Sequence, residues 1–457
     1  MDATACITGS AAVSIDLRTE PDLRGHDRLS QPPPELAPER HDPLAALRQR
    51  SFVLFTLSRV LSVTGSSLLQ AALAWQVWAI SDSELSLGVL GLVRFLPALG
   101  MSLIGGAAAD TYNRRNIIVI AQCVPLTCAA VLAAATFGGW QRIEIIFGLV
   151  LVIGLASSFE GPARSALLPA IVRPETFANA VTVSTTLQTL GMVSGPALAG
   201  AVITVASVGA AYSVFIGLVA TSLVPMLLLR YRQAAGNGRS VSFEAIREGV
   251  RFVRQRQVLL GAMSLDMFAV IFGGAQALLP VYTTDVLKVG PWGYGVLTAS
   301  LELGAFLMSL VMVLRPPVVN TGRVLVYSVM AYGAATMGFG LSRVFVVSVV
   351  LYMLVGAADM VSMVMRNTTI QLATPDELRG RVSAVAQVFI GASNQLGAVE
   401  SGFVAAATNA TFAVVSGGAG ALTVAAAIGW RLRELMAYRI AGRPIEETAV
   451  EEPARVV

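Results

Sequence analysis

Apolar positions along the chain gather in long runs that short polar stretches separate. Each run is close to the ~20 residues with which an α-helix crosses the hydrocarbon core of a bilayer. The pattern predicts an all-α membrane protein with twelve transmembrane helices. The predicted spans are residues 52–79, 86–109, 116–138, 143–163, 178–203, 208–229, 258–282, 292–314, 324–342, 344–365, 382–406 and 411–430.

The composition supports membrane insertion. Of the 457 residues, 55% are hydrophobic and 13% are charged, whereas about a quarter of the residues of a soluble protein are charged. The mean hydropathy is +0.70. A soluble enzyme, a disordered chain and a secreted disulfide scaffold are therefore poor interpretations.

Basic residues predict the orientation of the helices. Outside the spans, the basic residues lie on one side of the predicted map, except Arg142, Lys288 and Arg343. Positively charged loops stay in the cytoplasm. We therefore expect both termini to be cytoplasmic, which requires an even number of spans, in the inner (plasma) membrane.

The longest internal connection divides the predicted spans into two groups of six. We expect a disordered cytoplasmic tail, a six-helix bundle, a cytoplasmic linker, a second six-helix bundle and a second cytoplasmic tail. Their residue ranges are 1–50, 51–230, 231–257, 258–430 and 431–457. The first tail is rich in proline and arginine and has no sustained apolar run.

The linker contains an apolar repeat. Phe243, Ile246, Val250 and Val253 follow one another at intervals of three or four residues. This spacing predicts an amphipathic helix that lies on the cytoplasmic face of the membrane. A solvated linker is the alternative.

The numbers and positions of lysine and histidine exclude several kinds of site. Lys288 is the only lysine and it is not part of a Gly-Lys-Ser/Thr loop, so there is no Walker A site for ATP. The two histidines, His26 and His41, precede the first span, which removes histidine metal ligands and a Ser-His triad from the apolar body. We expect no metal, no cofactor and no nucleic-acid partner, and we expect a monomer.

The two predicted halves resemble each other. A segment from Arg164 to Val181 follows the fourth span, and a segment from Arg366 to Val382 follows the tenth. Each begins with an arginine at a helix exit and continues with Pro-acid before the next helix. Equivalent positions in the two halves favour an internal duplication over a chance match.

Four segments carry a family resemblance. Residues 105–115 contain Gly106, Asp110, Arg114 and Arg115, residues 191–200 read GMVSGPALAG, and the segments PARSALLP and TPDELRGR follow spans four and ten. Together they resemble the major facilitator superfamily, in particular its drug/proton antiporter branch with the enterobactin exporter and macrolide efflux proteins. The resemblance implies two six-helix halves that rock around a central site.

The resemblance implies roles for these motif residues. Asp110, Arg114 and Arg115, with Gly106, would form a gating loop that stabilises the outward-open state, although a plain cytoplasmic anchor also explains the arginines. The antiporter motif of the fifth span would seal the path to the outside, and ordinary tight packing is the alternative. The motif residues are Gly191, Gly195, Pro196 and Gly200 in the antiporter motif and Arg164, Arg366, Arg379 and Arg381 in the cytoplasmic loops.

Four acidic residues fall inside predicted spans: Asp266, Glu302, Asp359 and Glu400. A charge near the bilayer centre costs at least about 2.5 kcal/mol and commonly marks a functional path. Low dielectric favours the neutral form of a carboxyl group, which can then take up and release a proton. Asp266 and Glu302 are the preferred proton carriers. The alternative is that such an acid only pairs with Arg59, Arg94 or Arg366.

The first half contributes polar groups that could bind a substrate: Arg59, Arg94, Gln70 and Gln76. An arginine in the membrane could bind an anionic substrate or neutralise an acid of the other half. We therefore expect a proton-coupled exporter of a small amphipathic molecule, drug-like or siderophore. The rivals are an importer, a lysophospholipid flippase and a membrane sensor that does not transport; an enzyme is the least favoured class.

Overall fold

The structure is a computed structural model that describes residues 45–231, 243–315 and 318–439. All regular structure in these ranges is helical. Residues 1–44 of the first tail, residues 232–242 of the linker and residues 440–457 of the second tail lie outside them. The helices of the first half are α1 (Arg50–Ser81), α2 (Glu84–Thr111), α3 (Arg114–Phe137), α4 (Ile143–Ile171), α5 (Phe177–Val205) and α6 (Val208–Leu228).

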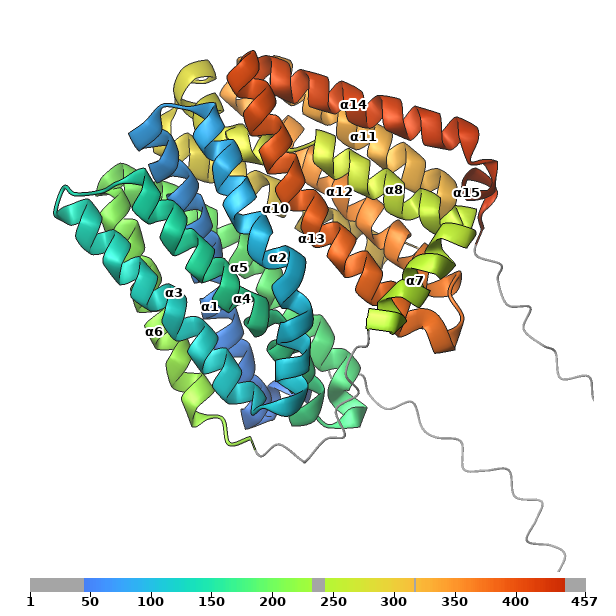
Figure 1. Cartoon of the computed structure of the whole chain (residues 1–457), viewed down its shortest axis with the longest axis horizontal. Coiled ribbons are helices and arrows are strands. Elements are labelled where there is room, and N and C mark those ends of the chain that lie inside the picture. The colour runs from blue at the N-terminus through green and yellow to red at the C-terminus, as the bar shows by residue number, and fades with distance from the viewer. Residues whose placement is uncertain (1–44, 232–242, 316–317, 440–457) are drawn as a thin grey trace, which may run out of the picture. The chain divides into compact units, whose positions relative to one another are not determined.

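The helix α7 (Phe243–Gln255) comes between the halves. The second half contains α8 (Gln257–Phe272), α9 (Leu279–Val281), α10 (Gly290–Leu314), α11 (Thr321–Leu341), α12 (Phe345–Leu372), α13 (Asp376–Ala407), α14 (Ala410–Arg431) and α15 (Arg433–Ala437). In Figure 1 the helices coloured blue to green form one group and those coloured yellow-green to red form the other.

Ten helical segments in the described ranges are long and apolar enough to cross a membrane. This confirms the prediction of an all-α protein with many membrane spans. Helices α2 and α13 are also long, with 28 and 32 residues. Several helices run further than the sequence pattern indicated: α4 ends at Ile171, where the predicted span ended at residue 163.

The two halves meet mainly through two helix pairs, α2 with α13 and α5 with α10. Glycines allow both contacts. A Cβ atom on Gly402 of α13 would lie 2.4 Å from the Cα atom of Gly88 in α2, and one on Gly295 of α10 would lie 2.7 Å from the Cα atom of Gly200 in α5. Small residues let membrane helices approach until their backbones touch. In each pair the contact lies within two turns of a helix end.

The first span of the second half is broken. Helix α8 stops at Phe272, and Gly273 and Gly274 lead into a 3-10 turn over Ala275–Leu278. A Cβ atom on Gly274 would lie 2.2 Å from the carbonyl oxygen of Gly397 in α13, so only glycine fits there. The Tyr332 hydroxyl donates a hydrogen bond to the Gly273 carbonyl at 3.0 Å, which satisfies a group that the break frees.

The predicted amphipathic repeat of the linker lies in α7. Its Val253 is buried, and Val250 and Phe252 pack beside it on Leu259 of α8 and Val382 of α13. These apolar side chains therefore contact the second half of the protein, where the sequence pattern predicted contact with lipid. Glu248, on the polar side of α7, forms an ion pair of 2.5 Å with Arg381 of α13.

Candidate functional site

The predicted gating loop is mostly helix. Helix α2 continues to Thr111, so Gly106 and Asp110 belong to it. Arg114 donates a hydrogen bond of 2.9 Å to the Ala166 carbonyl of α4. Arg115 donates to the carbonyls of Met226 (3.0 Å) and Leu227 (2.5 Å) at the end of α6. Both arginines thus join α3 to helices of the same half, and Arg115 satisfies last-turn carbonyls of α6.

The antiporter motif on α5 has two faces. Gly191 and Gly195 lie against α1, where a Cβ atom on Gly195 would come within 2.7 Å of the Thr64 carbonyl oxygen. Gly200 lies against α10 of the other half, and Pro196 lines a cavity between the halves. The same helix therefore packs tightly on its own half and touches the other half.

The arginines assigned to cytoplasmic loops lie in helices. Arg164 and Arg366 are only 7% and 4% exposed and belong to α4 and α12. The loop assignment is wrong because both helices continue for at least one turn beyond the last apolar run. Arg379 and Arg381 likewise belong to the first turns of α13, where Arg379 is exposed.

Buried Arg164 is part of a polar cluster in the first half. Its Nε atom lies 2.7 Å from Oε1 of Glu160, one turn earlier in α4. The same carboxylate oxygen accepts hydrogen bonds from Ser62 of α1 (3.2 Å) and Gln122 of α3 (3.1 Å). Glu160 thus joins three helices. This cluster holds the first half together without a residue of the second.

Asp266, one of the two preferred proton carriers, is in an ion pair. Its carboxylate contacts the guanidinium of Arg366, and Asp266 itself is 6% exposed. The pair joins α8 to α12. This is the alternative that the sequence left open for a buried acid: a link between helices in place of a free carboxyl group.

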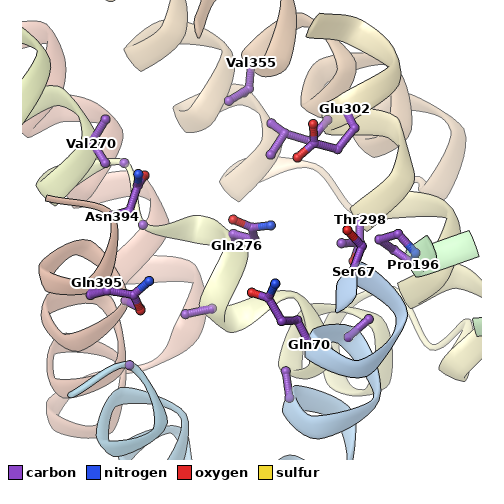
Figure 2. Close-up of a pocket in the computed structure, with 18 of the residues that line it drawn as sticks. Ser67, Gln70, Pro196, Val270, Gln276, Thr298, Glu302, Val355, Asn394 and Gln395 are labelled. Carbon is purple, nitrogen blue, oxygen red and sulfur yellow. The ribbon is translucent and has the colours of Figure 1, made fainter. Parts of the chain in front are cut away.

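A cavity of about 440 Å³ lies between the halves and takes residues from both (Figure 2). Glu302 of α10 and Asp359 of α12 line its wall in the second half, and Arg94 of α2 lines it in the first half. No ion pair joins any of the three to another residue in the described ranges. The structure therefore brings together two of the four predicted acids and one of the two intramembrane arginines.

Carboxamide side chains contribute much of the remaining polar lining. Figure 2 shows Gln70 and Gln276 extending into the cavity, with Asn394 and Gln395 on the side of α13. Of these four, only Gln70 is among the residues that the sequence pattern predicts. The available signal was an uncharged amide inside an apolar span, and for Gln276 its place directly after the Gly273–Gly274 break.

Aromatic residues at and beside the cavity join the two halves. The Tyr294 hydroxyl of α10 donates to the Ala71 carbonyl of α1 at 3.2 Å, and its ring lies 5.5 Å from that of Trp75, measured between centroids. Nearby, Nε1 of Trp78 donates to the hydroxyl of Thr284 at 3.0 Å. These contacts join the two halves at the same end as the Gly200–Gly295 contact.

The remaining candidates lie away from the cavity lining. Arg59 donates hydrogen bonds to Ser184 (3.4 Å) and Gln188 of α5. Gln76 is buried among Thr136, Gln141 and Tyr212 and bonds to all three. Glu400 is partly buried and accepts a hydrogen bond of 3.3 Å from Ser401. In the described structure, Arg59 and Gln76 join helices of the first half.

Two groups of long apolar helices around a polar cavity define a membrane transporter of the major facilitator type. The model of the transmembrane secretion effector family within this class matches residues 41–453, so the chain belongs to that family.

Two named relatives align with this chain over most of the length of both proteins. The multidrug efflux pump Tap of Mycolicibacterium fortuitum is 27% identical over 399 residues, covering 84% of this chain and 96% of Tap. The enterobactin exporter EntS of Escherichia coli O1:K1 is 24% identical over 387 residues, covering 84% of this chain and 92% of EntS.

Solved structures share the fold. A point mutant of the nucleoside transporter NupG superposes with a TM-score of 0.68 at 12% identity, covering 83% of this chain and 99% of NupG. A bacterial homologue of the human lysosomal transporter Spinster, solved inward-facing and unoccupied, gives a TM-score of 0.66 at 16% identity, covering 85% of this chain and 98% of that chain. At these identities the similarity concerns the fold alone.

Proposed function

We propose that the protein is a proton-coupled exporter of a small amphipathic molecule, drug-like or siderophore, that works by alternating access across the inner membrane. The observation that carries the proposal is the cavity between the halves, where Arg94 faces the same space as Glu302 and Asp359, all three outside the ion pairs of the described residues. The relatives named as a multidrug efflux pump and an enterobactin exporter support the direction of transport.

In this proposal α2 and α13 complete a set of twelve spans with both termini in the cytoplasm. The positive-inside rule supports this orientation, because the basic loops then face the cytoplasm. The contacts of Gly200 with Gly295 and of Gly88 with Gly402 then lie at the outer ends of their helices. The conformation is accordingly closed to the outside, and the cavity takes up substrate from the cytoplasm.

Proton coupling is assigned to Glu302 and Asp359. Both line the cavity, and Asp359 also lies within electrostatic range of Glu302, Asp266 and Arg366. A change in solvation on rocking would alter the proton affinity of such carboxyl groups. Asp266 keeps a positioning role, since Arg366 holds its carboxylate.

The driving force is sufficient. One proton charge that crosses about 100 mV supplies roughly 2.3 kcal/mol. Each tenfold concentration ratio of a neutral solute requires about 1.4 kcal/mol. A single proton per cycle therefore sustains a gradient of more than tenfold.

Two experiments in sequence test the proposal. A deletion strain is first screened for drug susceptibility and exported metabolites, with and without an uncoupler, to identify a substrate and its direction. Proteoliposomes with a pH-sensitive dye then report substrate-driven proton flux. We expect Glu302→Gln and Asp359→Asn to abolish the flux, and Glu144→Gln, at an exposed position of α4, to leave it unchanged.

Undiminished proton flux in both carboxyl variants contradicts the assignment of the proton carriers. Uptake of the substrate in place of export contradicts the proposed direction and favours an importer of the same fold.

A further inference from the structure

The charges of the cavity are separated between its two walls, and this separation bears on the substrate of the proposed transporter. We infer that the substrate is a zwitterion whose anionic group binds Arg94 of the first half and whose ammonium group binds Glu302 and Asp359 of the second. The inference rests on the proposed function, since it assigns the chemistry of the molecule that the cavity carries.

The guanidinium of Arg94 forms no ion pair within the described residues. The hydrogen bond that the structure gives its guanidinium runs from Nη2 to the Gln70 carbonyl, and its length of 3.4 Å makes it weak. A guanidinium held within a membrane span without an anion is costly. Its planar fork of donors matches a carboxylate or another flat oxyanion. Arg94 is therefore a site for an anionic group of the substrate.

The two carboxyl groups share the opposite wall because α10 and α12 cross there. A Cβ atom on Gly304 of α10 would lie 1.9 Å from the Met353 carbonyl oxygen, and one on Gly356 of α12 would lie 1.9 Å from the Leu301 carbonyl oxygen. The helix backbones touch at these glycines. Glu302 and Asp359 each lie within one turn of the crossing, on helices whose backbones are in contact.

Carboxylates that form no ion pair with an arginine or lysine favour a cationic ligand. In the described ranges, neither Glu302 nor Asp359 has an arginine or lysine in an ion pair. A substituted ammonium group would pair with these carboxylates and would compete there with protons. The exchange of an ammonium group for protons at one wall is what proton antiport of a substrate requires.

A singly charged substrate could pair either with Arg94 or with the two carboxyl groups, but not with both. A cation would leave Arg94 without an anion and would meet a like charge across the cavity, whereas an anion would face two carboxyl groups. The body of the substrate would contact amides and aromatic rings. The hydroxyls of Tyr294 and Tyr332 already donate to backbone carbonyls, at 3.2 Å and 3.0 Å, so they offer the substrate ring surface more than donors.

A molecule of this kind also explains why the charges belong to different halves. Arg94 lies on α2 of the first half, and the two acids lie on helices of the second. A zwitterion that contacts both would stabilise conformations in which the halves close around it, and a ligand shifts an equilibrium only through such differential affinity. The cavity volume of about 440 Å³ lies within the range of roughly 300 to 1,000 Å³ found for drug-sized ligands.

Binding of three related probes tests the inference. Ciprofloxacin carries a carboxylate and a piperazinium, its methyl ester carries only the cation, and N-acetylciprofloxacin carries only the anion. Equilibrium binding is measured by their fluorescence with purified protein in lipid nanodiscs, without a proton gradient. We expect ciprofloxacin to bind the wild type about tenfold more tightly than either analogue, the change that one charge-assisted hydrogen bond produces.

Variants of each wall test which residues bind the carboxylate of the probe and which bind its ammonium group. In Arg94→Gln, ciprofloxacin and its methyl ester should bind equally, and Arg94→Lys should restore part of the preference. In the double variant Glu302→Gln with Asp359→Asn, ciprofloxacin and N-acetylciprofloxacin should bind equally. The control Arg343→Gln removes an arginine that bonds the Gly340 carbonyl outside the cavity and should bind like the wild type.

Equal affinity of the wild type for ciprofloxacin and its analogues overturns the inference, and so does the absence of binding of all three. An Arg94→Gln variant that weakens all three probes by the same factor also overturns it, because Arg94 would then support the fold without reading charge. Since no gradient is present, loss of proton-coupled transport leaves this preference intact. Failure of the proposed function is therefore distinguishable from failure of the inference.

Discussion

Gly200 of α5 and Gly295 of α10 touch through their backbones, such that a Cβ atom on Gly200 would lie only 2.6 Å from the Cα atom of Gly295. The contact joins the two halves near one end of the cavity. A single added methyl group must separate the helices, because real Cβ atoms do not approach backbone atoms so closely.

The first prediction concerns this contact. We expect Gly200→Ala to weaken the closed end of the cavity and to increase its accessibility from outside. The measurement is labelling of a cysteine at Ala71, introduced into a chain with serine at Cys6, Cys123 and Cys128, by an impermeant maleimide added to whole cells. Faster labelling than in the parent is the expected result.

Gly217→Ala is the matched control for the glycine contact, since nothing lies within 4 Å of a Cβ atom at Gly217 of α6. Its labelling rate should equal that of the parent. Equal rates in the Gly200→Ala variant would show that the two glycines do not close the cavity.

The second prediction concerns the pair of Asp266 and Arg366. Asp266→Asn leaves a buried guanidinium without its anion, which costs about 3 kcal/mol or more. We expect a marked fall in the melting temperature in detergent. The double variant Asp266→Asn with Arg366→Gln removes both charges and should recover most of the loss. A single variant as stable as the wild type would contradict the pairing.

The third prediction concerns Glu160. Its carboxylate accepts hydrogen bonds from Ser62 and Gln122 and pairs with Arg164. We expect Glu160→Gln to lower stability by a few kcal/mol, because Arg164 is buried and would lose its anion. Thermal unfolding measures the change, and Glu144→Gln serves as the control. Equal melting temperatures for the two variants would rule out a stabilising cluster.

The fourth prediction concerns the exposed ion pair of Arg381 and Glu248, in contrast to the Asp266–Arg366 and Glu160–Arg164 pairs. The side chains of Arg381 and Glu248 are 40% and 51% exposed. Surface pairs contribute about 0 to 1 kcal/mol. Arg381→Gln should therefore shift the melting temperature far less than Asp266→Asn, and the shift should shrink further at high salt. A loss as large as that of Asp266→Asn would show that the pair anchors α7 to α13.

The sequence predicted the helices well because apolar runs long enough for a bilayer have few alternatives. It missed helix ends that carry charges. Arg164 lies in α4 and Arg366 in α12, beyond the last apolar residues of each predicted span. Their charges indicated loops, whereas the partly buried Glu160 and the buried Asp266 neutralise them inside the protein. A local hydropathy pattern contains no information on such distant partners.

The sequence indicated only some of the cavity residues, again because a local pattern does not show distant partners. Acids in apolar spans are conspicuous, but the sequence could not show which one is paired. Asp266 and Arg366 lie on helices far apart in the chain, and Arg59 and Arg94 were equally available. Gln395 and Asn394 escaped notice because a neutral amide barely alters hydropathy. Only the packing of α13 across the cavity gives them a role.

The Gly273–Gly274 break separates α8 from the segment that carries Thr284. Thr284 accepts a hydrogen bond from Trp78 of the first half, while α8 is tied to its own half by the ion pair of Asp266. If the two halves separate at the Gly200–Gly295 end, α8 and the segment that carries Thr284 therefore need not move as one rigid helix. Rotation about Gly273 and Gly274 would let the segment that carries Thr284 move with the first half while α8 moves with the second.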